Sequence, residues 1–179
     1  MAMPEQLTVQ ALVDGGKLAG SWTLDGARSE VRLNTRHTWG LSVLHGFFRQ
    51  VTGHGTVTAA GDVSGVITVA ATSIDTKNAR RDKHLRSADF FDIENHPDIT
   101  FAADGVSATD GGVQVTGSLT IRGRTRPAAI DAKVSVTDDE VQLDGVLQVN
   151  RADFGLTWNF LGIAGMDNTI VVHAVFIRS

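Results

Sequence analysis

The sequence of 179 residues contains no cysteine and no tyrosine, and only 3 of its residues are proline. Without cysteine, the chain has no disulfide, no thiolate nucleophile and no cysteine-based metal site. Its 16 lysines and arginines against 20 aspartates and glutamates give a net charge of −4. Nucleic-acid-binding proteins use an excess of basic residues to displace counterions from phosphates, so we expect no nucleic-acid partner. No stretch of the sequence approaches the roughly 18 apolar residues of a membrane span.

The length and the N-terminal composition bound the domain organisation. A chain of 179 residues closes one hydrophobic core, so we expect a single domain over residues 21–179. Residues 1–20 precede it as an arm that is either flexible or adds a strand. The arm carries Glu5, and it has neither a basic cluster nor an apolar run of the length found in signal peptides. We therefore expect a cytoplasmic protein.

Alternation of apolar and polar residues with a period of two dominates the chain. In residues 30–39, for example, Val31, Leu33 and His37 share one face, while Arg32 lies on the other. Gly, Asp and Asn interrupt the alternation at regular intervals, which is typical of antiparallel strands joined by tight turns. The pattern predicts eight strands, at residues 30–39, 46–59, 63–74, 98–107, 113–121, 127–137, 140–150 and 168–178.

Two longer stretches break the alternation, and connections of this length in a small β domain usually carry function or close an opening. Residues 75–97 are highly charged, and they predict a short helix that presents Leu85 and Phe90 inward and Asp82 outward. Residues 151–167 are punctuated by glycine. We expect the helix to close one end of the domain and to move when a ligand enters.

Eight sequential antiparallel strands form either an up-and-down barrel or a two-sheet sandwich. The pattern favours a barrel, because long strands joined by short turns close without leaving an exposed edge. The interior is either packed with side chains or keeps a cavity for one ligand, since a barrel of this size lined by small residues leaves room. The alternation leaves both alternatives open.

The sequence carries no recognisable catalytic or metal-binding motif. It has no Gly-x-Ser-x-Gly elbow, phosphate-binding loop, His-Glu-x-x-His helix or dinucleotide fingerprint. Its 6 histidines show no spacing that places two imidazoles on one ion. His37 is either a core histidine bonded to a backbone carbonyl or a polar group that meets a ligand. We expect no metal, no cofactor and no catalytic residue.

Basic side chains gather in two places where a phosphate or a membrane surface could dock. They are Arg80, Arg81, Lys83 and Arg86 near the predicted helix, and Arg122, Arg124 and Arg126 in a hairpin. For the hairpin we favour a solvated turn, since alternation places its three arginines on one side. Transient contact with a membrane is kept as an alternative.

Five segments between Trp22 and the C-terminus carry a resemblance to a known family. In order, they are SEVRLNTRH, HGFFRQVTG, SIDTKNARRDKHLRSADFFDIENHPDITF, VTGSLTIRGRTRP and NRADFGL. Together they closely resemble the YceI-like family of lipocalin-like, polyisoprenoid-binding proteins. The resemblance implies an all-β, eight-stranded antiparallel lipocalin-like barrel with a short helix in the 75–97 connection. It also implies an apolar tunnel for a long isoprenoid chain, and frequent pairing as a homodimer.

From the pattern and the resemblance we expect a non-enzymatic protein that binds a long isoprenoid lipid or an isoprenoid quinone, for carriage, storage or sequestration. Alternation and the grouping of aromatic residues supply the candidate wall residues Leu33, His37, Phe48, Ile67, Val69, Leu85, Phe90, Phe91, Phe101, Leu119 and Trp158. On an extended chain Phe90 and Phe91 point to opposite sides, so only one of them can line a given cavity. The alternatives are a barrel enzyme that acts on a lipid or small amide with His37 as acid or base, and a stress-related interaction protein with a filled barrel.

Overall fold

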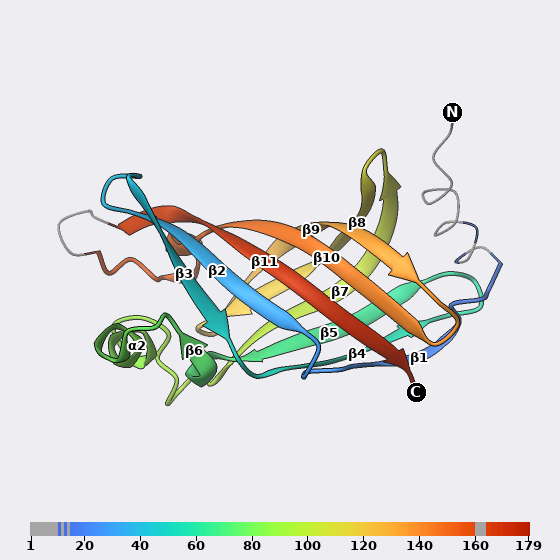
Figure 1. The fold of residues 1–179 in the computed structure, drawn as a ribbon, viewed down its shortest axis with the longest axis horizontal. Coiled ribbons are helices and arrows are strands. Elements are labelled where there is room, and N and C mark those ends of the chain that lie inside the picture. The colour runs from blue at the N-terminus through green and yellow to red at the C-terminus, as the bar shows by residue number, and fades with distance from the viewer. Residues whose placement is uncertain (1–10, 12, 14, 160–163) are drawn as a thin grey trace.

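The computed structural model describes residues 11, 13, 15–159 and 164–179. One antiparallel sheet curls into an elongated barrel, with the helix α2 at one end and the C-terminus at the other (Figure 1). None of the described helical segments has the length and apolar character needed to cross a bilayer. The strands are β1 (Gly20–Leu24), β2 (Glu30–His37), β3 (Ser42–Phe48), β4 (Val51–Val57), β5 (Val63–Ala70), β6 (Ile74–Asp75), β7 (Asp98–Thr109), β8 (Gly112–Ile121), β9 (Arg124–Val136), β10 (Glu140–Asn150) and β11 (Ala164–Arg178). The helical segments are η1 (Ala71–Ser73), α2 (Ala79–Arg86) and η2 (Arg151–Phe154).

Eight of these strands form a closed ring. Its order is β1-β4-β5-β7-β8-β9-β10-β11, and it closes because β1 pairs with β11 as well as with β4. The predicted eight-stranded antiparallel barrel is therefore confirmed. The strands β2, β3 and β6 extend the wall at the end that carries α2, where β2 replaces β1 as the neighbour of β11.

The observed strands differ from the predicted ones where the chain steps between these two parts of the wall. Segment 46–59 is divided at Arg49 and Gln50 into β3, which pairs with β2, and β4, which pairs with β1. Segment 63–74 is divided by η1 into β5 and β6. The alternation did not predict β1, a strand of 5 residues. These breaks follow from closure, because β1 and β2 share the length of β11.

The step from β1 to β2 is fixed by a close approach of backbones. The Asp25 amide donates to the Val175 carbonyl at 2.8 Å, and the Asp25 carboxylate accepts from the Ala27 amide at 3.0 Å. A Cβ atom at Gly26 would lie 2.5 Å from the Val51 carbonyl oxygen. Only glycine fits there, so the turn is built into the sequence.

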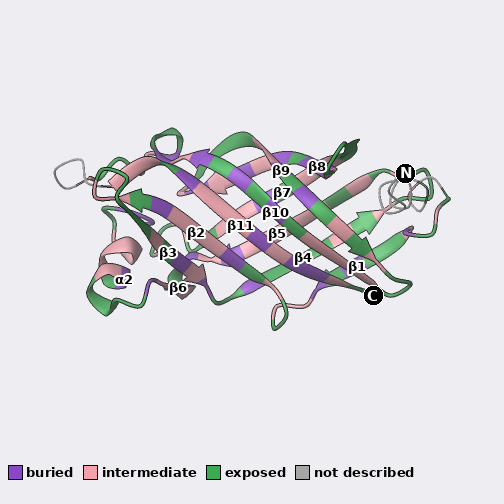
Figure 2. Cartoon of the chain, turned by 45° about the horizontal axis from the view of Figure 1, so that its top comes forward, coloured by how far each residue is buried: buried purple, intermediate pink, exposed green. Residues whose placement is uncertain are grey.

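Buried residues alternate with exposed ones along the second half of β10 (Figure 2), and mainly with half-buried ones along β8. On β8, for instance, Val113, Val115 and Leu119 face inward and are buried. The inward faces of all wall strands join into one hydrophobic core. The period of two in the sequence therefore indicates whether each residue faces the inside or the outside of the barrel.

Helix α2 lies at the end of the barrel, in the connection between β6 and β7, as predicted (Figure 1). Its first turn is capped by Asn78, whose side-chain oxygen accepts from the Arg81 amide at 3.0 Å. The helix ends at Arg86, and the Ser87 amide then donates to the His84 carbonyl at 3.1 Å. It stops short of Phe90 because the chain turns there.

Candidate functional site

Among the described residues, two apolar cavities adjoin one another inside the barrel. The cavity near α2 has a volume of about 80 Å³, and the cavity near the C-terminus has a volume of about 160 Å³. Ile67, Phe101 and Ile130 line both of them, and we call these three residues the waist. The two cavities and the waist form the tunnel. Each volume is below the roughly 300–1,000 Å³ of ordinary ligand pockets, so a long ligand requires side chains at the waist to move.

Most of the predicted wall residues line the cavity near α2. They are Leu33, Phe48, Ile67, Val69, Phe90, Phe91 and Phe101. The ring centroids of Phe90 and Phe91 are 4.8 Å apart, and those of Phe48 and Phe91 are 6.0 Å apart. Both Phe90 and Phe91 reach the cavity, contrary to the expectation for an extended chain, because this segment is turned. The Phe90 amide donates to the Ser87 carbonyl at 3.0 Å and the Phe91 amide to the Leu85 carbonyl at 2.9 Å.

The remaining predicted wall residues lie beside the tunnel lining. His37 ends β2, and its Nδ1 lies 3.1 Å from the neighbouring threonine hydroxyl. Leu119 is buried in the core, and Leu85 of α2 packs against that core while partly exposed. Trp158 is 46% exposed, and its ring centroid lies 4.2 Å from that of His84. Contact with a ligand stays a prediction for every residue of the set.

Sequence reasoning missed part of the lining near α2. The further residues are Val31, Ile99, Ile121, Ile130, Leu147, Val149, Arg151, Leu156, Asn168, Ile170 and Val172. Most of them could have been found by extending the apolar face along each strand, since Val31 has the parity of Leu33. Asn168 has the parity of Ile170, but its polarity argues against an inward position. Arg151 lies in η2, where the alternation has ended.

Arg151 brings a buried charge to the lining of this cavity, and it is 4% exposed. Its guanidinium donates hydrogen bonds at 2.8–3.3 Å to the backbone carbonyls of Leu156, Trp158, Ala164 and Gly165. Its Cζ also lies 5.7 Å from the centroid of the Phe90 ring, within range of a cation–π contact. Burial lowers the pKa of Arg151. The side chain thus connects residues 156–158 to residues 164–165 beside the cavity near α2.

A second polar group at this end is the buried pair Thr35 and Asn168, which joins β2 to β11. The Thr35 hydroxyl donates to Oδ1 of Asn168, and Nδ2 of Asn168 donates to the Met166 carbonyl at 2.8 Å. The polar groups of Arg151 and Asn168 are therefore engaged inside the protein. The surface available to a ligand in this cavity is therefore mainly apolar.

The cavity at the other end is partly closed by residues that precede β1. Val13 and Leu18 belong to the predicted N-terminal arm and line this cavity together with Trp22. The Trp22 indole donates to the Leu18 carbonyl at 3.0 Å. Arg178 donates to the carbonyls of Ala19 (3.0 Å) and Lys17 (2.9 Å), and its Cζ lies 4.4 Å from the Trp22 ring centroid. The rest of the predicted arm, residues 1–10, 12 and 14, lies outside the described residues.

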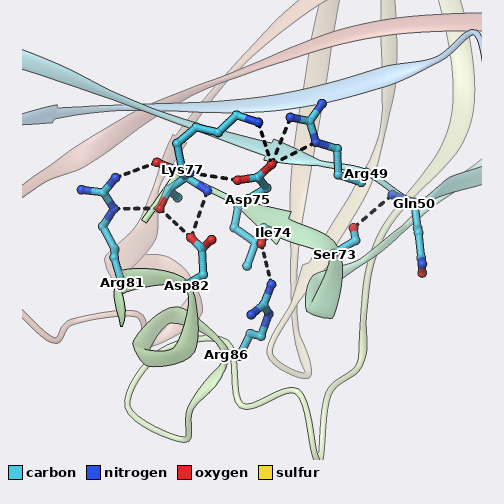
Figure 3. A network of polar contacts seen from close by, with 10 residues as sticks. Arg49, Gln50, Ser73, Ile74, Asp75, Lys77, Arg81, Asp82 and Arg86 are labelled. Carbon is cyan, nitrogen blue, oxygen red and sulfur yellow. Dashed lines mark hydrogen bonds and ion pairs between the residues drawn. The ribbon is translucent and has the colours of Figure 1, made fainter. Parts of the chain in front are cut away.

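Helix α2 is anchored to β6 by a polar network (Figure 3). One oxygen of the Asp82 carboxylate accepts from the Thr76 amide at 2.9 Å and from the Thr76 hydroxyl at 2.5 Å. Arg81 donates to the same hydroxyl and to the Thr76 carbonyl, both at 2.8 Å, and Arg86 donates to the Ile74 carbonyl at 2.7 Å. The outward orientation predicted for Asp82 is wrong, because its carboxylate turns in to satisfy Thr76. Arg81 and Arg86 of the predicted basic cluster are likewise used within the protein.

Replacing Asp82 by alanine is expected to lower the free energy of unfolding by about 1–3 kcal/mol. The substitution leaves the buried Thr76 amide and hydroxyl without this acceptor, and an unsatisfied buried polar group costs about that much. Urea denaturation measures the change. The matched control is Asp89→Ala, since Asp89 is exposed in the same connection, and it should stay within about 0.5 kcal/mol of the parent. Equal losses in the two variants would show that the network does not carry the stability.

Asp75 makes the stability depend on pH. Its carboxylate accepts from the Lys77 amide (2.9 Å), from the Lys77 ammonium (3.1 Å) and from Arg49 (3.1 Å). These contacts lower the pKa of Asp75 to about 2. A carboxyl group whose pKa is lower in the folded state stabilises the fold above its unfolded pKa of roughly 3.9, and this contribution is lost as the pH falls through about 2.

We therefore expect Asp75→Asn to flatten the decrease in unfolding free energy between about pH 4 and pH 2. Urea denaturation at several pH values in this window measures the slope for the variant and the parent. The two curves should converge only below about pH 2, where the carboxyl group of the parent is protonated in both folded and unfolded chains. If the unfolding free energies of the variant and the parent had the same slope against pH throughout this window, Asp75 would not be the source of the pH dependence.

Comparison with known proteins places this geometry in a family. The YceI-like domain matches residues 22–176. A UPF0312 protein of Pectobacterium atrosepticum is 31% identical over 180 residues, which cover 92% of this chain and 90% of that protein. The crystal structure of BcnA from Burkholderia cenocepacia is similar with a TM-score of 0.77 at 23% identity, over 85% of this chain and 98% of that one. A polyisoprenoid-binding domain from Saccharophagus degradans, implicated in plant cell wall breakdown, has a TM-score of 0.68 at 12% identity, over 88% of this chain and 98% of its own. The chain belongs to the YceI-like domain family.

Proposed function

We propose that this protein binds a long isoprenoid lipid, either a polyisoprenoid or an isoprenoid quinone, inside the tunnel, and that it carries, stores or sequesters that lipid. The observation that carries the proposal is the pair of adjoining apolar cavities joined at Ile67, Phe101 and Ile130. Membership of the YceI-like family and the similarity to a polyisoprenoid-binding domain support it.

The driving force for such binding is the transfer of hydrocarbon out of water. Each methylene group contributes about 0.8 kcal/mol, so an isoprene unit of five carbons contributes on the order of 3–4 kcal/mol. Ordering a flexible chain and removing it from a membrane offset most of this gain. The narrow bore of the tunnel favours a slender chain over a fused-ring lipid, because the chain can thread the waist one unit at a time.

We also infer that the protein acts without catalysis. Among the described residues that line the cavity near α2, Arg151 and Asn168 are the polar ones, and both are committed to hydrogen bonds within the protein. His37 would be the acid or base if the protein were a barrel enzyme. It ends β2, beside a threonine hydroxyl. Replacing His37 by glutamine should therefore leave ligand binding unchanged.

Three further properties of this function stay proposals. A lipid that resides in bilayers must be collected there, so we propose transient contact with a membrane. The other two are pairing as a homodimer, which the family resemblance implies, and a cytoplasmic location. Size-exclusion chromatography and cell fractionation test the last two directly.

The binding proposal is tested by offering the purified protein a series of prenyl alcohols of increasing chain length in a mild detergent. Native mass spectrometry reads the bound mass. We expect one lipid per chain, with occupancy rising with chain length as more methylene groups leave water. A protein that binds none of the series, or that binds short and long chains equally weakly, would not have the proposed function.

A further inference from the structure

The tip of the β2–β3 hairpin presents large apolar side chains to solvent. Trp39 is 74% exposed, Leu41 is 85% exposed and Val43 is 52% exposed. Single exposed apolar residues are ordinary on protein surfaces, but three of them within five residues form a patch that indicates an interaction site. Figure 1 shows that this hairpin projects from the barrel at the end that carries α2.

Two backbone amides of the tip donate to carbonyls within it. The Gly40 amide donates to the His37 carbonyl and the Leu41 amide to the Thr38 carbonyl, both at 3.1 Å. Thr38, Trp39 and Gly40 all have positive φ values of 53°, 51° and 89°. In this left-handed turn the side chains of Trp39 and Leu41 are exposed, while the amides of Gly40 and Leu41 are paired within the turn. Amides that are already paired within the turn lower the cost of moving the tip from water into a bilayer surface, where fewer waters are available to the backbone.

The charge of the hairpin differs from that of the whole chain. From Val31 to Gly61 the sequence contains no aspartate or glutamate, although the chain has a net charge of −4. The hairpin carries Arg32 and Arg36, and Arg36 is exposed close to the tip. Basic residues beside an apolar tip are attracted to anionic lipid headgroups, and tryptophan prefers the membrane–water interface. The charge pattern therefore favours an anionic partner over a neutral one, and the exposed tryptophan favours a bilayer as that partner.

The hairpin is continuous with the wall of the tunnel. Its strands contribute Val31, Leu33 and Phe48 to the lining of the cavity near α2. The tip therefore lies at the same end of the barrel as that cavity and α2 (Figure 1). A bilayer that receives the tip would face the tunnel at this end.

We propose that the β2–β3 tip inserts Trp39 and Leu41 into the headgroup region of an anionic bilayer, and so docks the α2 end of the tunnel on the membrane for transfer of ligand. The inference rests on the proposed function, since it concerns the place where the isoprenoid is collected. The tip contacts the bilayer, and the tunnel receives the lipid.

The test is flotation of the full chain with vesicles of phosphatidylcholine alone or mixed with phosphatidylglycerol. We expect binding to the mixed vesicles, weakened about tenfold by the double substitution Trp39→Ser/Leu41→Ser. The matched control is Val146→Ser/Ile177→Ser, which removes exposed apolar side chains elsewhere on the barrel (43% and 39% exposed) and should bind as the parent does. Arg36→Glu should weaken binding to the mixed vesicles and spare the residual binding to phosphatidylcholine.

A separate measurement keeps this test apart from the test of the function. The Trp39→Ser/Leu41→Ser variant should still bind prenyl alcohol in detergent, because neither residue lines the tunnel cavities. Vesicle binding that is unchanged in this variant would overturn the docking proposal. The proposal would also be overturned if the parent protein did not bind vesicles but formed a dimer that the Trp39→Ser/Leu41→Ser variant did not form. The tip would then contact a second copy of the chain. Failure of the parent protein to bind prenyl alcohol would instead overturn the proposed function.

Discussion

Replacing Ile67 by tryptophan is expected to lower the affinity for a long prenyl alcohol at least tenfold and to spare a short one. Ile67 lines both cavities from β5, and its register partner on β7 is Phe101, another residue of the waist. An indole at this point separates the cavity of about 80 Å³ from the cavity of about 160 Å³. A long chain then cannot thread the waist, whereas a short chain still fits in one cavity. A tenfold change corresponds to about 1.4 kcal/mol of binding free energy.

The fold should survive this substitution. Overpacking a core costs about 1–3 kcal/mol, which is less than the roughly 5–15 kcal/mol that stabilise a typical domain. Val146→Trp is the matched control, since Val146 faces outward on β10 and is 43% exposed. Native mass spectrometry with the prenyl alcohol series compares the two variants. Equal occupancy by the longest chain in Ile67→Trp and Val146→Trp would mean that the ligand does not pass the waist.

Replacing Arg151 by methionine is expected to lower the free energy of unfolding by about 3–5 kcal/mol. The change removes one donor from each of four backbone carbonyls, of which the Ala164 carbonyl keeps a second donor, Nδ2 of Asn159 at 2.7 Å. Each buried acceptor left without a partner costs about 1–3 kcal/mol, although water reaches some of them once the segment loosens. Methionine keeps much of the apolar volume, so the loss reports the hydrogen bonds more than a cavity.

Arg151→Lys separates geometry from charge. A single ammonium cannot reach all four carbonyls that the planar guanidinium contacts through its three nitrogens, so we expect lysine to recover only a minor part of the loss. Arg126→Met is the control, because Arg126 is exposed and donates only to the adjacent Thr125 carbonyl among the contacts that the structure describes for it. Urea denaturation of the three variants gives the comparison. Full recovery by lysine would show that the charge alone matters at this position.

Much of the fold could be predicted because the period of two is a local property. Strand β10 has the predicted bounds, residues 140–150, since its alternation is unbroken and both of its ends carry turn residues. Strand β1 escaped prediction, because its pairing with β4 and β11 brings together segments far apart in the sequence. The division of the wall between β1 and β2 depends on this pairing, and no local pattern records it.

The tunnel could be predicted in part, for a related reason. Alternation assigns a residue to a face of the wall, but it does not say how far along the barrel that residue lies. Leu33 and His37 share a face, yet only Leu33 reaches the cavity, because His37 stands at the end of β2. Arg151 escaped prediction because its role depends on carbonyls brought together by the folded chain. Phe90 and Phe91 were found by their grouping, and the turn that aims both inward emerged only in three dimensions.

The most direct measurement is native mass spectrometry of the protein purified from its own host, followed by organic extraction and identification of the extract by its fragment masses. The account predicts a stoichiometric isoprenoid lipid, which the Ile67→Trp variant purified in the same way should lack. A parent protein that carries no lipid, and whose mass does not change when a long prenyl alcohol is supplied in detergent, would contradict it. The two cavities would then be voids in the core that hold no lipid, and the search for function would move to the outer surface of the barrel.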